Sequence, residues 1–235
     1  MWSKSSGISL IACLLIWILF GFISPKIATN VANIKNPYPS KFEFNTSIEN
    51  DKKNGLDGHN PWNEAAKKLE EETLQNYGVE NIEQLPFNYV GFRMQKGEEH
   101  EAEIYKKHYG LLKNIAKKQN DTYKSLSFLT PFITFRFLSM ELANSSDYLH
   151  WKFSEAVEKY RIEKQQFLNY DIKDNSVYGE RGYKMSSEKF KKLPKFSFAP
   201  PPLLELLKDN QQNLLFLFLW IAIPFIGLLV TSKKI

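Results

Sequence analysis

The sequence is poor in cysteine and histidine, and its charge is nearly balanced. Its 235 residues include one cysteine and four histidines. Cys13 cannot form an internal disulfide or a cysteine-rich zinc site by itself, so the fold must depend on packing. The formal net charge of +5 is spread along the chain and does not indicate nucleic-acid binding. A mean hydropathy of -0.38 excludes a polytopic bundle that lies mostly in lipid.

The sequence motifs of common catalytic sites are also missing. There is no glycine-rich phosphate loop, no Gly-x-Ser-x-Gly elbow and no His-Glu-x-x-His pair. His100 and Glu103 have the i,i+3 spacing that di-metal helical bundles use, but no other segment offers matching ligands. We therefore expect no catalytic residue, no metal ion and no cofactor, and nothing here indicates an enzyme.

Two uncharged apolar runs lie near the ends of the chain, Gly7–Ser24 and Leu214–Val230. A helix that crosses ~30 Å of hydrocarbon needs ~20 apolar residues, with ~17 as the lower limit. We expect transmembrane helices over residues 7–24 and 213–232, with a domain between them over residues 25–212. A cleaved signal peptide is the alternative for the first run, although its apolar stretch exceeds the ~7–15 residues of a signal core.

Lysines stand on the outer side of both runs. Lys4 precedes the first run, and Lys233 and Lys234 follow the second. Because short flanking segments dominate the positive-inside rule, both termini are expected in the cytoplasm. The domain between the runs is then expected on the far side of the membrane.

A third apolar stretch, Leu126–Ala143, is less suited to lipid because Arg136 lies near its centre. An arginine there costs ~2.5–3.5 kcal/mol on insertion scales. We interpret this stretch as a helix that is buried within the domain or lies at the membrane surface, and we disfavour a third span. Arg136 then either pairs with a buried partner or extends to the surface.

Helix signals dominate the rest of the chain, and the expected fold is all-α, with no strand beyond a short piece near Phe87–Met94. Expected helix boundaries are Asn60-Pro61 at a start, Gly78 at an end, Gly97 at the start of a longer helix, Ser145 or Ser146 at another start, and Pro202 at the start of a helix that continues through Leu214 into the membrane.

Eight polar residues are candidates for a functional or structural role: Asp57, His59, Glu98, Glu99, His108, Arg136, His150 and Arg161. For most of them a structural explanation competes. His59 lies in a turn before a helix, where a turn or cap residue is commoner than a ligand. Glu98 and Glu99 suit the solvated start of a helix, and His150 beside Trp151 suits packing.

Short motifs follow one another in order along most of the chain. They are Asn36-Pro37-x-Pro39-Ser40, Gly55-Leu56-Asp57-Gly58-His59-Asn60-Pro61, Tyr77-Gly78-Val79, Met94-Gln95-x-Gly97-Glu98-Glu99, Tyr160-Arg161 and Pro194-x-Phe196. In these residues the chain resembles an extracytoplasmic domain of unknown function found in bacterial ABC-2 type permeases. The resemblance implies the membrane half of an ATP-driven exporter in the bacterial cytoplasmic (inner) membrane. It implies no catalytic role for the matching residues.

The function expected from this resemblance is that of a permease-type subunit of an ABC transporter or related complex, with a partner-binding or gating domain outside the membrane. The implied partners are the lipid bilayer, a multi-span permease subunit and an ABC ATPase. Such permeases carry further spans before this domain, so either a second polypeptide supplies them or the chain is a truncated or specialised relative. The alternatives are a membrane-tethered structural or adaptor protein and, less favoured, a tethered hydrolase or metal protein.

Overall fold

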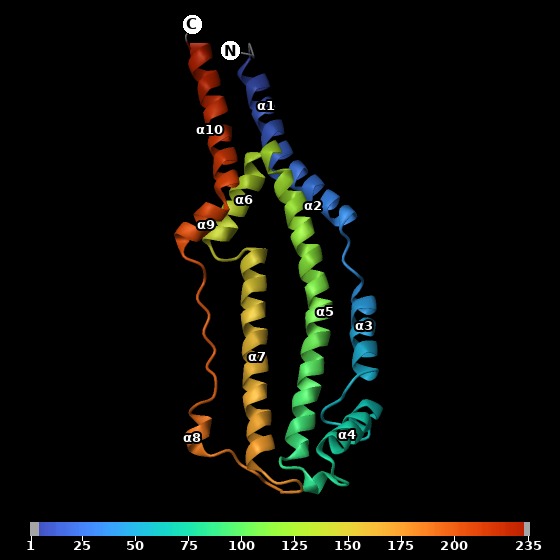
Figure 1. Ribbon diagram of the computed structural model, residues 1–235. Coiled ribbons are helices and arrows are strands. Elements are labelled where there is room, and N and C mark those ends of the chain that lie inside the picture. The colour runs from blue at the N-terminus through green and yellow to red at the C-terminus, as the bar shows by residue number, and fades with distance from the viewer. Residues whose placement is uncertain (1–4, 233–235) are drawn as a thin grey trace. The chain divides into compact units, whose positions relative to one another are not determined.

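The computed structural model describes residues 5–232, and these residues form helices joined by turns and loops (Figure 1). No strand occurs in this part of the chain, so the all-α prediction is confirmed. Lys4, Lys233 and Lys234, on which the expected orientation depends, lie outside the described residues. The chain divides into two compact units: the first contains the residues up to Tyr38, Lys113–Lys152 and those from Ala199 onward, and the second contains Pro39–Leu112 and Phe153–Phe198.

The first unit begins with a continuous helix of 30 residues. It consists of α1 (Ser6–Ile18), the π-helical segment η1 (Leu19–Ile23) and α2 (Ser24–Lys35). At 1.5 Å per residue such a helix is about 45 Å long, so it exceeds the ~30 Å of a hydrocarbon core. The helix therefore continues past the expected span into a polar segment that begins at Lys26.

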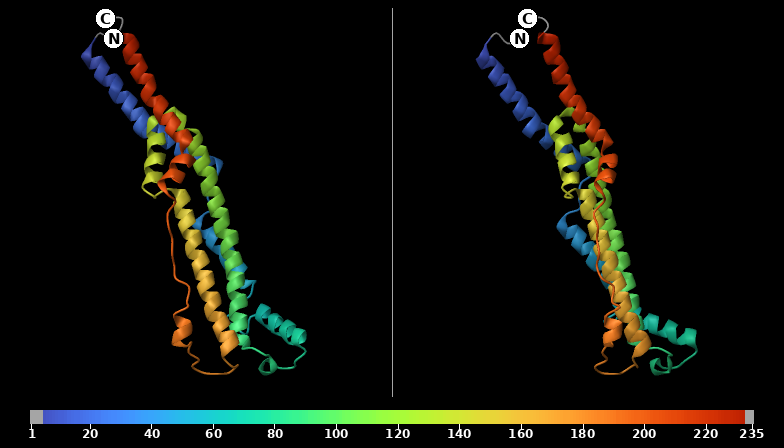
Figure 2. Two further views of the ribbon diagram at one scale, coloured as in Figure 1. Left: turned by 60° about the vertical axis from the view of Figure 1, so that its left-hand side comes forward. Right: turned by 90° about the vertical axis from the view of Figure 1, so that its left-hand side faces the viewer.

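The first unit ends with α10 (Gln211–Ser232), a second apolar helix of 22 residues. Both helices are long and apolar enough to cross a membrane, and their apolar windows are not buried in protein. The beginning of α1 and the end of α10 lie at the same end of this unit in both views of Figure 2. The prediction of two apolar helices at the ends of the chain is therefore confirmed.

The apolar stretch near the middle of the chain forms a short helix of the first unit. Ser127–Leu129 is a 3-10 turn, η3, and Pro131–Leu142 is α6. Because α6 has 12 residues it is about 18 Å long, too short to cross a membrane. It packs against η1, α9 and α10. Its inner face forms a small core with Ala28 of α2 and Tyr123 of α5, and Leu126, just before η3, packs against this core: the α6 members are Ile133 and Phe137.

The helix expected from Pro202 into the membrane is interrupted, which corrects that prediction. It consists of α9 (Leu203–Asp209) and α10, with Asn210 between them in a non-helical conformation. The Asn210 side chain donates to the Leu206 carbonyl oxygen at 2.9 Å and accepts from Asn213 at 3.0 Å. The Asn210 N–H bonds to the Leu207 carbonyl, so the Asn210 side chain supplies the donor that the Leu206 carbonyl loses where the chain turns.

The second unit contains two long helices and several short ones. The long helices, α5 (Tyr89–Ser125) and α7 (Asp147–Asn175), also extend into the first unit. The short elements are α3 (Lys41–Lys53), α4 (Glu64–Tyr77), η2 (Ile82–Gln84) and α8 (Ser187–Phe190).

Two expected helix starts are wrong: that of α4, where Asn63 is the cap, and that of α5, where the Asn88 side chain accepts from the Val90 N–H at 2.9 Å. Asn63 rather than Asn60 caps α4, because Asn60 bonds to the Trp62 N–H within a turn and Asn63 accepts from Ala66. The long helix α5 starts at Tyr89 instead of Gly97, so no strand occupies Phe87–Met94.

The other two boundary signals agree with the structure. Gly78 ends α4 in the left-handed conformation with φ 65°, as expected. Ser146 precedes α7, and its hydroxyl accepts from the Leu149 N–H at 3.3 Å.

Within the second unit, α5 and α7 approach each other closely near the start of α5. The Asn88 N–H donates to the Lys173 carbonyl oxygen at 2.8 Å, and Asn169 is completely buried. A Cβ atom on Gly91 would collide with the backbone of Lys173 and Asn169. Glycine is therefore needed here because it permits backbone contact between the two helices.

We predict that Gly91→Ala destabilises the chain by several kcal/mol, because neither contacting backbone can move aside without disturbing its helix. Gly110→Ala is the matched control, since a Cβ on Gly110 of the same helix meets nothing within 4 Å. This second change should be neutral or stabilising by up to about 1 kcal/mol. Equilibrium unfolding of the full chain in detergent measures both. Equal effects of the two variants would contradict the close approach.

Candidate functional site

The apolar helix at the start of the chain contains a carbonyl oxygen that lacks its backbone donor. In η1 the Ser24 N–H bonds to the Leu19 carbonyl, five residues back. The next bond of this π-helical register would join Pro25 to Phe20, but proline has no N–H. The Thr130 hydroxyl donates to the Phe20 oxygen instead, at 3.2 Å. Thr130 is fully buried, and its hydroxyl also caps α6 by accepting from the N–H of Phe132.

The other apolar helix is bonded to the same segment. The indole Nε1 of Trp220 in α10 donates to the Phe128 carbonyl oxygen at 3.1 Å. The Trp220 ring also meets Phe20 edge to face, with ring centroids 5.3 Å apart. The segment Ser127–Leu142 therefore bonds to both apolar helices at the point where these helices touch. We call these two hydrogen bonds and the ring contact the helix clamp.

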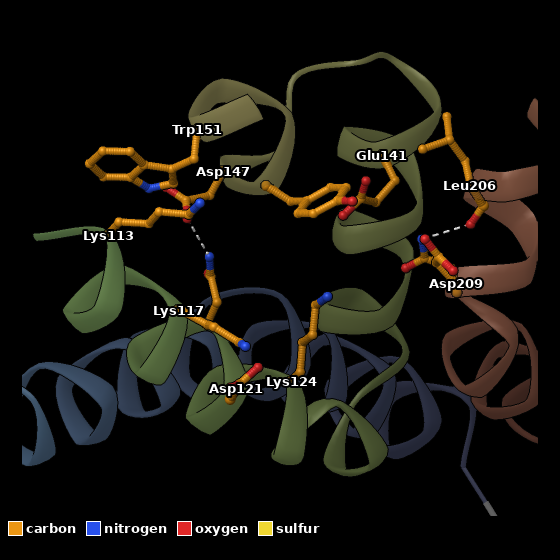
Figure 3. A pocket seen from close by; sticks show the side chains of 12 residues that line it. Lys113, Lys117, Asp121, Lys124, Glu141, Asp147, Trp151, Leu206 and Asp209 are labelled. Carbon is orange, nitrogen blue, oxygen red and sulfur yellow. Dashed lines mark hydrogen bonds between the residues drawn. The ribbon is translucent and has the colours of Figure 1, made fainter. Parts of the chain in front are cut away.

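The first unit also contains a cavity of about 420 Å³, which we call the charged pocket (Figure 3). Its walls come from four helices and the Asn210 linker, and most of its lining is charged or aromatic. Figure 3 shows lysines of α5 on one wall and residues of α6 and α7 facing them. The lining residues are Lys113, Lys117, Asn120, Asp121, Lys124, Glu141, Asp147, Tyr148, Trp151, Leu206, Asp209 and Asn210.

The lining of the charged pocket contains two buried polar groups, the Glu141 carboxylate and the Trp151 Nε1. Glu141 is 5% exposed, and it accepts a hydrogen bond from the Ser146 hydroxyl at 3.0 Å. No ion pair joins Glu141 to a basic side chain within residues 5–232. The Trp151 Nε1 is buried and has no hydrogen-bond partner in the same part of the chain. Because buried polar groups are normally paired, the Trp151 N–H favours a ligand that accepts a hydrogen bond in this pocket.

In the second unit, three of the candidate residues line a smaller cavity of about 150 Å³: Asp57, His59 and Glu98. The loop that carries Asp57 and His59 is held against α5 by a bond from Arg93 Nε to the Gly58 carbonyl, at 3.1 Å. Asp57 itself accepts from the His59 N–H at 3.0 Å, which is a turn contact. Both side chains are exposed.

The other candidates of this unit form pairs between or along helices. Arg161 in α7 donates hydrogen bonds to Glu98 in α5 at 2.7 Å and to Glu158 at 2.9 Å. The bond to Glu158 contributes most to raising the pKa of Arg161, and the bond to Glu98 raises it further. His108 is buried, and its Nε2 lies 2.6 Å from an Asp51 oxygen of α3.

Within α5, Glu99 bonds to Lys96 at 2.8 Å and to Gln95 at 3.2 Å. All these pairs join neighbouring turns or helices, and this arrangement suits a structural role.

The remaining two candidates belong to the first unit and lie at its surface. Arg136 is exposed, and its guanidinium carbon lies over the Tyr123 ring, 5.9 Å from the ring centre. Of the two expectations for Arg136, the surface position is therefore the one observed, with a cation–π contact. His150 is exposed and touches Trp151 edge to face, at 5.8 Å between ring centres.

The residues of the helix clamp and the charged pocket were not among the sequence candidates. Thr130 precedes a proline and is an ordinary helix cap in the sequence, and Trp220 is one aromatic residue within an apolar run. The lysines of α5 suit the end of a helix macrodipole equally well. A signal for the clamp does exist in Pro25, which removes a backbone donor from an apolar helix.

These observations describe an all-helical chain with two long apolar helices and a clamp that joins the segment Ser127–Leu142 to both of them. The chain belongs to the family described as "Domain of unknown function (DUF3526)", whose sequence profile matches residues 41–199, about two thirds of the chain. Comparisons with curated proteins and with solved structures found no match. The matched segment includes α6 and Thr130, but it excludes both apolar helices.

A carboxylate of the second unit gives a prediction about pH. Burial alone would raise the pKa of Asp171, but bonds from Lys189 at 2.9 Å and Tyr183 at 2.7 Å outweigh it and hold this pKa below its usual value. The same bond raises the pKa of Tyr183 to about 12. As the pH falls, Asp171 is protonated in the unfolded chain before it is protonated in the folded chain, because its pKa is lower in the folded chain. The free energy of unfolding should therefore decrease as the pH drops below about 4, the usual Asp pKa, and through the pKa of the folded chain.

Asp171→Asn should therefore reduce the loss of stability between about pH 5 and pH 2, while lowering stability at pH 7. Thermal unfolding of the full chain across this range measures the effect. Asp174→Asn removes an exposed carboxylate of the same helix and controls for net charge. An unchanged pH profile in Asp171→Asn would show that these bonds do not contribute.

We predict that Trp220→Phe lowers the unfolding free energy by about 1 kcal/mol, because it deletes the bond to Phe128 and keeps the ring against Phe20. Trp17→Phe is the control, since the Trp17 ring contacts Phe22 at 5.2 Å and makes none of the contacts that define the helix clamp. Equilibrium unfolding in one detergent compares the two variants. Equal unfolding free energies of the two variants would show that the Trp220 hydrogen bond does not stabilise the helix clamp.

Proposed function

We propose that the chain is a permease-type subunit of an ABC (ABC-2 type) transporter or of a related ATP-driven membrane complex. In this proposal the two apolar helices cross the bacterial cytoplasmic membrane, both termini lie in the cytoplasm, and the helical domain stands outside. The partners are a multi-span permease subunit and an ABC ATPase. The domain binds partners or gates the outer exit of the transport path.

The observation that carries this proposal is the helix clamp. A protein that is only tethered needs no bond between its domain and its membrane anchor. Here Thr130 bonds to the first apolar helix and Phe128 to the second. A shift of either helix therefore acts directly on α6, as a gate that follows the membrane part of a transporter requires.

Both apolar helices also contain features that favour bending. The π-helical turn η1 and Pro25 interrupt the regular hydrogen bonding of the first helix. Pro224 within α10 leaves the Trp220 carbonyl without its helical donor. Such interruptions weaken a helix locally and occur in membrane proteins at positions that change shape. They support a helix pair that moves rather than a passive anchor.

The order of motifs along the chain is the further support. These motifs resemble the extracytoplasmic domain of ABC-2 type permeases, and the matched family segment covers most of the helices between the apolar runs. This resemblance is the reason for preferring a transporter component over an adaptor protein, which would need the apolar helices but not the clamp.

Labelling in intact cells tests the orientation. Val177 is 73% exposed, and Val177→Cys in a Cys13→Ser background places one thiol on the domain. We expect an impermeant maleimide to label this thiol before the cells are broken, because the domain lies outside. The Cys13→Ser background alone is the control for non-specific labelling. Labelling that requires broken cells would place the domain inside and contradict the proposal.

Cross-linking followed by purification from native membranes tests the partners. We expect an ABC ATPase and a multi-span protein to accompany the chain. Trp220→Phe should alter the rate of ATP hydrolysis by this complex, and Trp17→Phe should not, because only the first variant weakens the helix clamp. Recovery of extracytoplasmic partners without an ATPase would support the adaptor alternative and overturn the transporter proposal.

A further inference from the structure

The charged pocket lies next to a membrane helix within its own unit. One wall ends in Asp209 and Asn210, and α10 begins at the next residue. The pocket is therefore placed where the polar part of a lipid meets an apolar helix. Its volume of about 420 Å³ is within the range of small-molecule sites, ~300–1,000 Å³.

The α5 wall of the pocket presents lysines together with one carboxylate, Asp121. Lys117 and Lys124 lie on α5, two helical turns apart, and in Figure 3 the Lys124 side chain extends from α5 toward the wall that carries Glu141. Neither lysine has a carboxylate partner within 4 Å among the described residues, and the Lys124 ammonium lies 5.3 Å from the centre of the Phe137 ring. Lysine ammonium groups with free donors suit phosphate oxygens. The buried Trp151 N–H on the facing wall is one more donor without an acceptor.

The facing walls carry carboxylates that suit a cation. Glu141 is nearly completely buried and has one hydroxyl as its hydrogen-bond partner, and Asp209 lines the pocket beside α10. A buried carboxylate without a basic partner is costly, so a positive group in the ligand would stabilise it. The pocket is thus suited to a ligand that carries both a phosphate and a cation.

The aromatic groups decide which kind of cation fits. A quaternary ammonium is held by a cage of aromatic faces. The face of Tyr148 already holds the Lys152 ammonium, at 4.7 Å from the ring centre. Lys152 therefore takes one face of Tyr148, and within the described residues no cage of several free aromatic faces surrounds the pocket, whose other ring is Trp151. The carboxylates Glu141 and Asp209 favour a primary ammonium that can donate hydrogen bonds. We propose that the charged pocket binds the phosphoethanolamine headgroup of a membrane phospholipid.

This inference depends on the membrane insertion of the proposed function but not on transport. The test uses the full chain purified in detergent and incubated with equal amounts of phosphatidylethanolamine, phosphatidylcholine and phosphatidylglycerol. Native mass spectrometry measures which lipid stays bound. We expect at least about tenfold preference for phosphatidylethanolamine. Equal retention of the three lipids would overturn the proposal, and this comparison needs no variant.

Variants assign the binding to the pocket. Lys117→Gln with Lys124→Gln should reduce retention of phosphatidylethanolamine at least about tenfold. The control is Lys106→Gln with Lys118→Gln, two exposed lysines of α5 that do not line the pocket. Asp209→Asn should retain phosphatidylglycerol but lose the preference for phosphatidylethanolamine. Unchanged retention in the first pair, or an equal loss in the control pair, would overturn the assignment.

A competition experiment distinguishes a lipid ligand from a soluble phosphate compound. Free phosphoethanolamine and inorganic phosphate should compete with the lipid only at concentrations at least about a hundredfold higher, because they lack the acyl chains that lie along α10. Competition at equal concentration would identify a soluble phosphate ester as the ligand and overturn the lipid proposal. A chain that passes the labelling test but shows no lipid selectivity contradicts the pocket alone.

Discussion

The carbonyl oxygen of Phe20 has no donor in its own backbone, and the structure of the first unit depends on how this oxygen is satisfied. A helix in lipid must pair its polar groups within the protein, since an unpaired one costs several kcal/mol. Pro25 removes the donor that the π-helical register would supply, and the hydroxyl of Thr130 replaces it. Because the same hydroxyl caps α6, one side chain fixes both the apolar helix and the position of the segment beside it.

The two units are stabilised in different ways. The core of the first is apolar and small, with Ile133 and Phe137 at its centre. In the second, helices meet through buried polar groups such as Gln95, His108 and Asn169, together with the backbone contact at Gly91. Buried polar pairs define a single register, since any shift would leave several groups unpaired. The second unit is therefore expected to keep one helix register, and the small apolar core of the first unit constrains its helices less.

Local signals made part of this fold predictable. The two apolar runs, the left-handed Gly78 and the Ser146 cap depend on neighbouring residues only, and sequence reasoning found them. The start of α5 at Tyr89 was missed because Asn88 looks like part of the preceding turn. The bond from Thr130 to Phe20 joins residues 110 positions apart, and no local pattern reports it. The candidate acids and histidines were visible in the sequence, yet most of them serve helix pairing.

The charged pocket is lined both by residues of the matched family segment and by residues next to the apolar helix α10. The matched residues 41–199 supply Lys117, Lys124 and Glu141, while Asp209 lies beyond them and is joined to α10 by one residue. A ligand that contacts both walls must therefore bind differently when α10 moves relative to α5. By linkage, the position of α10 must respond to the ligand by the same free energy. Since Trp220 of α10 is bonded to the turn before α6, a change at the pocket and a change at the helix clamp act on the same helix.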